Sequence, residues 1–499
     1  MKSALARITL LSFLFFLFMP HFTSAETKTF TKEYTYQASE DDSRNSSRTI
    51  ALREVKRLLL EELGTYLESE TVVKNFQLTK DQVTAFTAGI VKAEVLDQKW
   101  DGDSLKYWLK AKITADTADV IKSIEALRKD RVKTKELEEL KRRSDELLSE
   151  NATLRKDLTA AKGETKQKRK VDYDENIKKL TAIEWFEKGL SLGMSGNYQD
   201  AIDAYSKAIE RNPKLLGAYN NRGLIYDKLN NNEQAINDFD RALKLKPKHT
   251  VAYNNRGVVY AKTGNYNQAM KDYNQAMKID PKFEAAYNNR GLVYSDLGNY
   301  KEAIEDFNKA ISLNPKFIDA FYNRGNTYGR LRDHKQALED YGRAIELYPQ
   351  YADAYVNRGA VYSDLGNYKQ AIKDYDTAIQ INPHIAMAYN NRGSAHIALG
   401  NNNQAIEDFT AAIKLDPKLQ IAYSNRGLAY NNVGDHNRAI RDLDMAIELN
   451  PRDAIAYGNR GLVYRNLGNI NQSNEDMKVA ATLGLKWFQD YLRERGITW

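Results

Sequence analysis

The chain contains no cysteine, only nine prolines and only six histidines among its 499 residues. Without cysteine there is no disulfide, no thiolate nucleophile and no cysteine-linked lipid anchor, so stability has to come from the buried core. None of the histidines has metal-ligand spacing, and the phosphate-binding loop, the dinucleotide fingerprint and the Gly-x-Ser-x-Gly motif are all absent. The sequence therefore predicts a protein that is not an enzyme and that uses no cofactor and no metal.

Long apolar runs are missing everywhere except near the N-terminus. Lys2 and Arg7 precede the run 8–19, and the small residues 23–25 lie just before Glu26. This pattern is typical of a secretory signal peptide, here residues 1–25. An uncleaved N-terminal anchor is the alternative, although the run is short for a membrane span. We therefore expect an exported protein of the bacterial periplasm or cell envelope, with no integral membrane span after cleavage.

The chain also lacks a large net charge of either sign. The chain has 74 Lys and Arg residues against 67 Asp and Glu residues, a net charge of +7. The basic residues are interspersed with acids rather than gathered in blocks, which is not the pattern of a nucleic-acid-binding surface. We expect protein or peptide partners and no nucleic acid.

The few prolines show a strict order. The six-residue sequence Ala-Tyr-Asn-Asn-Arg-Gly at 218–223 recurs at 252–257 and 286–291, and looser copies follow at the same interval. A fixed period of this length indicates a solenoid, in which each unit buries its apolar face against its neighbours. Proline ends a helix, so each unit closes at its proline. Eight prolines lie 34 residues apart: Pro213, Pro247, Pro281, Pro315, Pro349, Pro383, Pro417 and Pro451.

One unit, residues 216–251, has the pattern of two antiparallel helices. Two sets of residues with helical spacing are separated by the turn 230–232, and Pro247 ends the second helix. Glycine costs about 1 kcal/mol relative to alanine inside a helix, so its return at one place in every unit indicates that close packing requires it. The two sets are Tyr219, Gly223 and Tyr226, and Ala235, Phe239 and Ala242.

These small and aromatic residues, followed by the proline, resemble the tetratricopeptide repeat, a helix–turn–helix unit of the same period. Nine tandem repeats are counted over 182–484, the first beginning near Ala182. The resemblance implies a mostly α fold, a right-handed superhelix (α-solenoid) that binds proteins on its concave face. Residues 485–499 then form an amphipathic helix that we expect to cap the last repeat, with partner binding as the alternative.

An arginine stands before each glycine where the family usually has leucine, and an aspartate follows sixteen residues later. Arginine suits a partly buried bidentate pair, so we predict an ion pair between the two helices of each repeat. Ligand binding by these arginines is the alternative. In the first repeat neither residue is present: Lys188 stands at the arginine position and Ala204 at the aspartate position. The predicted pairs are Arg222–Asp238, Arg256–Asp272, Arg290–Asp306, Arg324–Asp340, Arg358–Asp374, Arg392–Asp408, Arg426–Asp442 and Arg460–Asp476.

An asparagine immediately precedes each of these arginines, and Glu187 takes its place in the first repeat. An asparagine amide both donates and accepts hydrogen bonds. The row resembles the asparagine ladders of superhelical family members, which implies contact with the main chain of an extended peptide in the groove. The alternative is that the asparagines cap or bridge neighbouring helices. The ladder comprises Asn221, Asn255, Asn289, Asn323, Asn357, Asn391, Asn425 and Asn459.

Residues 26–126 have the pattern of a separate small α/β domain of order β-α-α-β-β-α. A strand around 30–36, helices at 42–69 and 80–88, and a hairpin around Asp101-Gly102-Asp103 are expected, followed by a helix. The order and the phrases at 64–66 and 89–91 resemble the small N-terminal domain of the flagellar outer-ring protein FlgT and related secreted lipoproteins. This resemblance implies an envelope-associated domain.

Residues 127–170 turn strongly charged and have a heptad pattern typical of a short coiled-coil helix. We predict either a weak parallel homodimer through 137–161 or a solvated helical linker, with a hinge at 162–170. The seam consists of Leu137, Leu140, Ser144, Leu147, Asn151, Leu154 and Leu158.

Together these patterns predict an exported, non-enzymatic scaffold that binds an extended peptide or partner protein through the asparagine ladder. One alternative is a structural or assembly component of an envelope or flagellar-type machine with one permanent partner. Another is a catalytic or ligand-binding N-terminal domain, which the absence of histidine from residues 26–126 disfavours.

Overall fold

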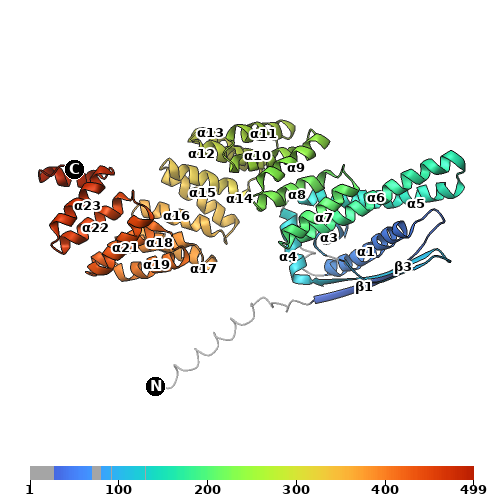
Figure 1. Cartoon of the computed structure of the whole chain (residues 1–499), viewed down its shortest axis with the longest axis horizontal. Coiled ribbons are helices and arrows are strands. Elements are labelled where there is room, and N and C mark those ends of the chain that lie inside the picture. Colours follow the sequence, from blue (N-terminus) through green and yellow to red (C-terminus); the bar gives the residue numbers. More distant parts are fainter. Residues whose placement is uncertain (1–26, 70–79, 92, 130) are drawn as a thin grey trace, which may run out of the picture. The chain divides into compact units, whose positions relative to one another are not determined.

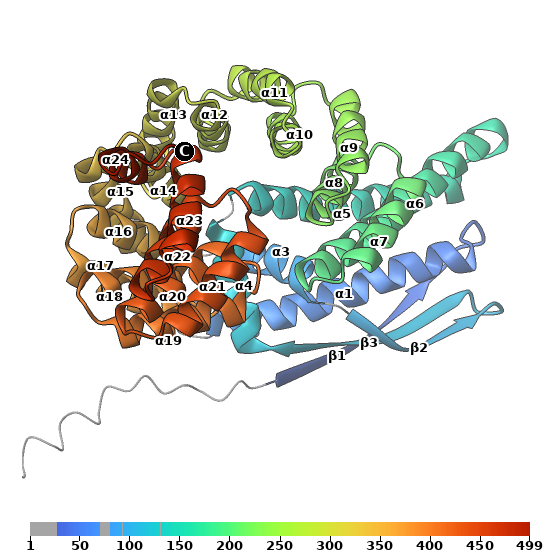
Figure 2. The same ribbon diagram turned by 60° about the vertical axis from the view of Figure 1, so that its left-hand side comes forward.

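The computed structural model describes residues 27–69, 80–91, 93–129 and 131–499, so the predicted signal peptide lies outside the described residues. The chain divides after Thr263 into two compact units, and the division falls within the third repeat. Figure 1 labels the elements of both units, and Figure 2 gives a second view. The described residues are mostly helical, as the sequence predicts.

The first unit begins with a three-stranded antiparallel sheet in the order β1-β3-β2. Tyr34 pairs with Leu109 and Phe30 with Ile113, so alternate residues of β1 and β3 face the same side. The predicted hairpin is present, with its turn between Asp101 and Lys106. The elements are β1 (Thr27–Gln37), α1 (Arg44–Ser69), α3 (Lys80–Ile90), β2 (Ala93–Asp101), β3 (Lys106–Asp116) and α4 (Thr117–Lys129).

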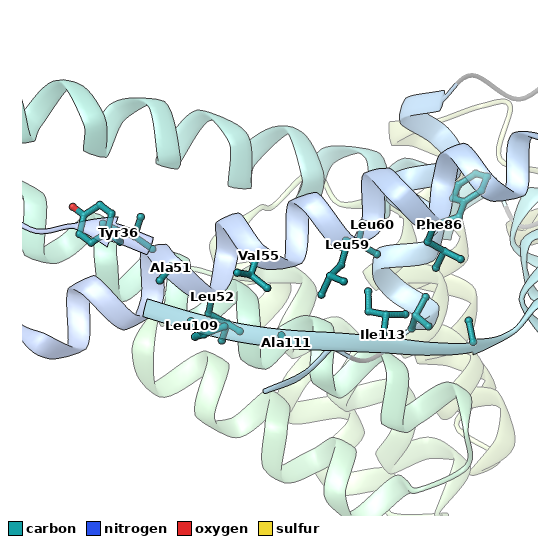
Figure 3. Packing of buried hydrophobic residues seen from close by; sticks show 14 of the residues in the cluster. Tyr36, Ala51, Leu52, Val55, Leu59, Leu60, Phe86, Leu109, Ala111 and Ile113 are labelled. Atoms are coloured by element: carbon teal, nitrogen blue, oxygen red, sulfur yellow. The ribbon is translucent and has the colours of Figure 1, made fainter. Parts of the chain in front are cut away.

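Helix α1 covers one face of this sheet, and the apolar residues between the two layers form the core (Figure 3). Leu59 from α1 and Leu109 and Ile113 from β3 are fully buried there, and Phe86 from α3 closes one end. Burying a side chain of this size contributes about 1.5–3 kcal/mol. These residues form the centre of the core of the N-terminal domain.

Helices α5 (Arg131–Ala160) and α6 (Gly163–Met194) follow as an antiparallel pair. Asn176 on α6 donates to Glu150 on α5 at 3.0 Å, and Arg169 lies 3.7 Å from Asp157. The turn between them ends at Gly163, whose φ of 59° suits glycine. Because α6 runs without a break into the first repeat, the predicted hinge at 162–170 is wrong.

The leucine seam of α5 is buried by the chain itself. Leu147 packs against Leu180 and Ile183 of α6, while Leu137 and Leu158 join the core of the N-terminal domain. Both predictions for this segment are therefore corrected: the seam is neither a solvated linker nor a surface for a homodimer. The leucine pattern indicated that α5 has an apolar face, but not which neighbour covers it.

The repeats that follow are helix pairs, with the C-terminal part of α6 as the first helix of the first pair. Consecutive helices pack against each other within each unit. The first unit continues with α7 (Tyr198–Arg211), α8 (Leu216–Lys228), α9 (Asn232–Leu245) and α10 (Thr250–Lys262). The second unit contains α11 (Tyr266–Ile279), α12 (Glu284–Asp296), α13 (Tyr300–Leu313), α14 (Ile318–Arg330), α15 (His334–Leu347), α16 (Ala352–Asp364), α17 (Tyr368–Ile381), α18 (Ala386–Ala398), α19 (Asn402–Leu415), α20 (Gln420–Asn432), α21 (His436–Leu449), α22 (Ala454–Asn466), α23 (Ile470–Thr482) and α24 (Lys486–Glu494).

The glycine after each arginine is required by the packing of the two helices in a repeat. A Cβ at Gly223 would lie 2.8 Å from the ring of Phe239, and one at Gly359 would lie 2.7 Å from the ring of Tyr375. Real Cβ atoms do not approach this closely, so the glycine lets a side chain of the second helix rest on the backbone of the first. This side chain is an aromatic ring in most repeats, and it is Leu443 at Gly427 and Met477 at Gly461.

Helix α24 covers the end of the last repeat. Phe488 and Leu492 are buried against Met477 and its neighbours on α23. Gly458 on α22 leaves the space that the ring of Phe488 fills. Trp487 on the same short helix is 58% exposed, so α24 has an apolar face toward the array and an aromatic side chain toward solvent. Among the described residues, no helix has the length and apolar character needed to cross a membrane.

Candidate functional site

The arginines that precede the recurrent glycines are here called the clamp arginines. Within the described contacts seven of the eight bind the aspartate of the second helix in their own repeat, and the pair Arg256–Asp272 stays a prediction. Arg358 donates to Asp374 through Nε and Nη2, both at 2.8 Å, and Arg290 contacts Asp306 in the same bidentate way at 2.7 Å. The aspartates are almost fully buried, while the arginines stay partly exposed. The same contact joins Arg222 to Asp238, Arg324 to Asp340, Arg392 to Asp408, Arg426 to Asp442 and Arg460 to Asp476.

Most clamp arginines also reach the second helix of the preceding repeat. Arg222 Nη1 donates to Ser206 Oγ at 2.8 Å, and Arg290 Nη1 donates to Asn274 Oδ1 at 2.6 Å. The acceptor always lies sixteen residues before the arginine, so one guanidinium ties three helices together. The other acceptors are Asp240 for Arg256, Asn308 for Arg324, Asp376 for Arg392, Thr410 for Arg426 and Asp444 for Arg460.

Arg358 differs because Gly342 occupies the position of the acceptor in the preceding repeat. A glycine has no side chain to accept from Nη1, so the hydrogen bonds described for Arg358 are those to Asp374. A Cβ at Gly342 would meet nothing within 4 Å. The described hydrogen bonds of Arg358 therefore join two helices, α16 and α17, whereas the clamp arginines of the neighbouring repeats, Arg324 and Arg392, each join three helices.

The electrostatics of the clamp keep it charged. Hydrogen bonding to Asp374 raises the pKa of Arg358 above its ordinary value, and Asp306 does the same for the pKa of Arg290. The guanidinium of Arg358 also lies 5.4 Å from the ring centre of Tyr355. These contacts within the array favour a structural role for the arginines over ligand binding.

The ladder asparagines all lie on first helices at one register, and most are half-buried. Asn323 Nδ2 donates to Asn288 Oδ1 at 3.0 Å, and Asn425 Nδ2 donates to Asn390 Oδ1 at 3.1 Å. In the first unit Asn255 donates to Asn220 at 3.2 Å. Each bond crosses from one repeat to the preceding one. Asparagine bridging between neighbouring helices is thus part of the ladder's geometry.

Several ladder asparagines use their amide hydrogens for these bridges. Asn357 Nδ2 donates to Tyr322 Oη at 3.0 Å and to Asn326 Oδ1 at 2.8 Å, and Asn425 donates to Ser394 as well as to Asn390. Asn289 and Asn391 accept from the asparagine that precedes each of them. An amide oxygen has two lone pairs, so the ladder can still accept hydrogen bonds.

The ladder has a different partner where it meets the N-terminal domain. Asn221 donates to Glu136 of α5 at 2.9 Å. One repeat earlier Glu187 is buried between Arg53, at 2.9 Å, and Lys56, both on α1. Burial raises the pKa of Glu187, but the two cations outweigh burial and hold that pKa below its ordinary value. This register position therefore anchors the array to the N-terminal domain.

Sequence reasoning missed the third-helix acceptors and the cations around Glu187. The acceptors had a detectable signal, because the position sixteen residues before each clamp arginine is polar in every repeat except at Gly342. Arg53 and Lys56 had none, since nothing in a single sequence relates α1 to a residue more than a hundred positions away. Among the described residues, no group of three or more His, Asp and Glu side chains could hold a metal ion.

Comparisons with known proteins agree with this geometry. The profile of the tetratricopeptide repeat matches residues 182–215, 217–249, 284–317, 318–351, 352–385, 386–419 and 421–453, and a related profile described as TPR repeat matches 260–298. No curated protein sequence matches the chain.

Several solved structures are similar to parts of the chain. A tetratricopeptide repeat protein from Parabacteroides merdae is 22% identical, with 50% of this chain and 99% of that chain covered and a TM-score of 0.41. MamA is 30% identical over 34% of this chain and 92% of its own, with a TM-score of 0.31. YrrB, described as having an unusual peptide-binding site, is 26% identical over 37% of this chain and 95% of its own, with a TM-score of 0.32. By its repeats and their profile matches, the chain belongs to the tetratricopeptide repeat family.

Proposed function

We propose that the chain is an exported scaffold without enzymatic activity that holds an extended segment of a partner protein along its first helices. Proteins of this family bind other proteins or peptides. The observation that carries the proposal is the row of half-buried ladder asparagines. The Nδ2 groups of Asn323, Asn357 and Asn425 are engaged between repeats, so their oxygens are the groups that an incoming main-chain N–H can use.

The proposal can be tested because it requires the ladder oxygens to accept hydrogen bonds from the N–H groups of the peptide main chain. Binding of random-sequence peptides to the full chain is measured by fluorescence anisotropy and repeated with peptides whose backbone nitrogens are methylated. If the ladder oxygens accept from the peptide main chain, methylation weakens binding about tenfold or more, because each lost hydrogen bond contributes about 1 kcal/mol. Equal binding of both peptide sets would overturn contact with the main chain.

A ladder variant separates binding from stability. Asn323, Asn357 and Asn425 are changed together to Ala in the full chain, and folding is checked by circular dichroism. The matched control changes Asn265, Asn299 and Asn367, which precede second helices, to Ala. We expect peptide binding to be lost only in the ladder variant. If both variants bind equally while only the ladder variant is less stable, the asparagines serve as bridges alone.

Export is a separate part of the proposal. It is supported by the charged, apolar and small-residue segments in order at 1–25. Residues 1–35 fused to alkaline phosphatase, which is active only outside the cytoplasm, are expected to give activity, and the change of Leu10, Leu11 and Leu14 to Lys is expected to abolish it. An inactive unmodified fusion would contradict export.

A further inference from the structure

The first helices of the second unit carry a row of side chains whose chemistry changes along the array. Helices α12, α14, α16, α18, α20 and α22 follow one another, and consecutive members are in contact (Figure 2). The second residue of each helix lies at one common register. From α14 to α22 these residues, here called the first-turn stripe, are Asp319, Asp353, Met387, Ile421 and Ile455.

The second half of the stripe is apolar and exposed. Met387 is 44% exposed, Ile421 is 45% exposed and Ile455 is 56% exposed, although the alanine that follows each of them is fully buried. Each repeat thus packs its alanine into the array and presents a large apolar side chain beside it. Single exposed apolar residues are ordinary, but three at one register on adjacent helices form a surface that gains from being covered.

The first half of the stripe is acidic and lined by tyrosines. Asp319 and Asp353 are exposed, and within the described part of the chain neither has an ion pair with Lys or Arg. The rings of Tyr322 and Tyr351 lie 4.8 Å apart beside them, and Tyr348 is 49% exposed nearby. Burial raises the pKa of Tyr351, and the charges of Asp319 and Asp353 raise it further, so both carboxylates act at this tyrosine. Carboxylates next to aromatic faces attract cations.

We propose that the first-turn stripe binds a partner segment that carries two basic side chains next to three apolar ones. The basic side chains lie at Asp319 and Asp353, and the apolar ones lie at Met387, Ile421 and Ile455. This inference rests on the proposed function, since it takes the segment to be extended along the first helices. It adds the chemical class of the partner, which the ladder asparagines leave open because they are alike in every repeat.

The geometry also sets the spacing of the partner's side chains. Packed helices lie about 8–10 Å apart, and an extended chain advances about 3.3 Å per residue. One repeat therefore corresponds to about three residues of the partner. The recognised pattern has basic, basic, apolar, apolar and apolar residues, each about three positions from the next.

The test uses the full chain and synthetic peptides that carry this pattern. One peptide has two lysines and then three leucines at the derived spacing, with serine and glycine between them, and a second has the reversed order because the chain direction is open. Two control peptides replace the lysines by glutamate or the leucines by serine. Affinity is measured by fluorescence anisotropy at low and high salt.

Protein variants locate the binding. The double change Asp319→Asn and Asp353→Asn is expected to lower the affinity for the patterned peptide about fivefold, and mostly at low salt. Ile421→Ser with Ile455→Ser is expected to weaken it about tenfold at either salt concentration. The matched controls are Glu302→Gln and Ile470→Ser, which alter exposed residues on the second helices α13 and α23 and should leave the affinity unchanged.

Each outcome decides between the two proposals. Preference for the patterned peptide, lost in the stripe variants and kept in the controls, supports the inference. Equal binding of patterned and control peptides would overturn the stripe while leaving a sequence-independent peptide scaffold in place. If no peptide of any sequence binds the full chain, both the stripe and the proposed function fail.

Discussion

The joint between two repeats and the joint between the N-terminal domain and the first repeat use one register position with opposite chemistry. Between repeats, a neutral amide such as Asn323 donates to another amide, Asn288, at 3.0 Å. At the N-terminal joint, a buried carboxylate, Glu187, lies between Arg53 and Lys56. Both joints bring a first helix against the element before it.

The difference follows from what each joint has to match. An amide donates and accepts, so a ladder asparagine can pair with the asparagine of the neighbouring first helix, as Asn323 does with Asn288. A carboxylate only accepts, so it needs a partner of another kind. A charge therefore suits a joint that occurs once in the chain and whose two sides are different, while self-complementary groups suit a joint that recurs.

The largest expected effect comes from removing the charge at the unique joint. Glu187→Gln leaves Arg53 and Lys56 buried without a counter-charge, so we expect the first unit to lose about 3–5 kcal/mol. Urea unfolding of the full chain, with hydrogen exchange followed in α1 and α6, measures the loss. Glu210→Gln, at an exposed position on α7, is the control and should change little. A loss below about 1 kcal/mol would show that the ion triad does not hold the joint.

The acid sensitivity of this joint follows from the same contact. The folded-state pKa of Glu187 is lowered, so its stabilisation is complete above the pKa of the unfolded chain and is lost as the pH falls through the folded pKa. Glu187→Gln should therefore reduce the pH dependence of stability in the acid range.

The clamp inside a repeat gives the next effect. Arg358→Leu leaves the buried Asp374 without its partner, and we expect a loss of about 2–4 kcal/mol in the second unit. Arg358→Leu with Asp374→Leu should recover part of it, because two apolar side chains leave no charge unpaired. A double-mutant cycle by urea unfolding measures the coupling. Additive effects of the two changes would contradict the pair.

Placing a charge in the recurrent joint tests the comparison directly. Asn323→Asp gives a carboxylate that cannot donate to Asn288, so we expect a loss of about 1–3 kcal/mol at neutral pH. Asn323→Ala removes the bridge without adding a charge and should cost less. Hydrogen exchange of α12 and α14 reports both. If the aspartate variant were as stable as the alanine variant, neutrality would not be what the joint requires.

A gain is expected where the three-helix clamp is incomplete. Gly342→Asn supplies the acceptor that Arg358 lacks, and the surrounding space is open. Gly342→Ala isolates the benefit of removing a helical glycine, about 1 kcal/mol. The asparagine variant should unfold at a urea concentration at least as high, although asparagine is the poorer helix former, because the added bond contributes about 0.5–1.5 kcal/mol.

The last expected effect is absent at neutral pH and develops only as the pH falls. Burial, aided by Lys246, lowers the pKa of His249 to about 4, and its Nδ1 accepts from Ala252 N at 3.1 Å at the start of α10. The folded state thus binds the proton less well than the unfolded state, so stability decreases as the pH falls below about 6.5 toward 4. His249→Asn keeps an N-cap and should remove this dependence. An unchanged pH profile of hydrogen exchange in α10 would contradict it.

The sequence predicted the repeats well because their period fixes both the helices and their partners. The separation of sixteen residues between Arg358 and Asp374 already places the two on facing helices of one repeat. It predicted the neighbours of unique segments poorly. Leu147 and Leu158 indicated an apolar face on α5, but only the fold shows that α6 and the N-terminal domain cover it.

The candidate site shows the same limit. The ladder was evident from its period, but its hydrogen bonds were not, because the amide of Asn425 can turn toward a peptide or toward Asn390. The first-turn stripe was overlooked because its residue type changes from repeat to repeat, whereas the sequence was searched for positions that keep the same residue type in every repeat. Their common register can be read from the 34-residue period, but their exposure on adjacent helices becomes visible only in the fold.

The amide joint also has a consequence for how such an array arises. Because Asn425 meets Asn390 as Asn323 meets Asn288, duplication in the gene of a 34-residue segment that carries both kinds of asparagine, the donor and the acceptor, creates a new joint that fits at once. Deletion of one segment restores the joint only where the residue before the retained ladder asparagine can accept, as Asn288 and Asn390 do and Val356 cannot. The length of the array is thus open to change by recombination, whereas the ends, at Glu187 and at the ring of Phe488 over Gly458, are each made once and have to be inherited whole.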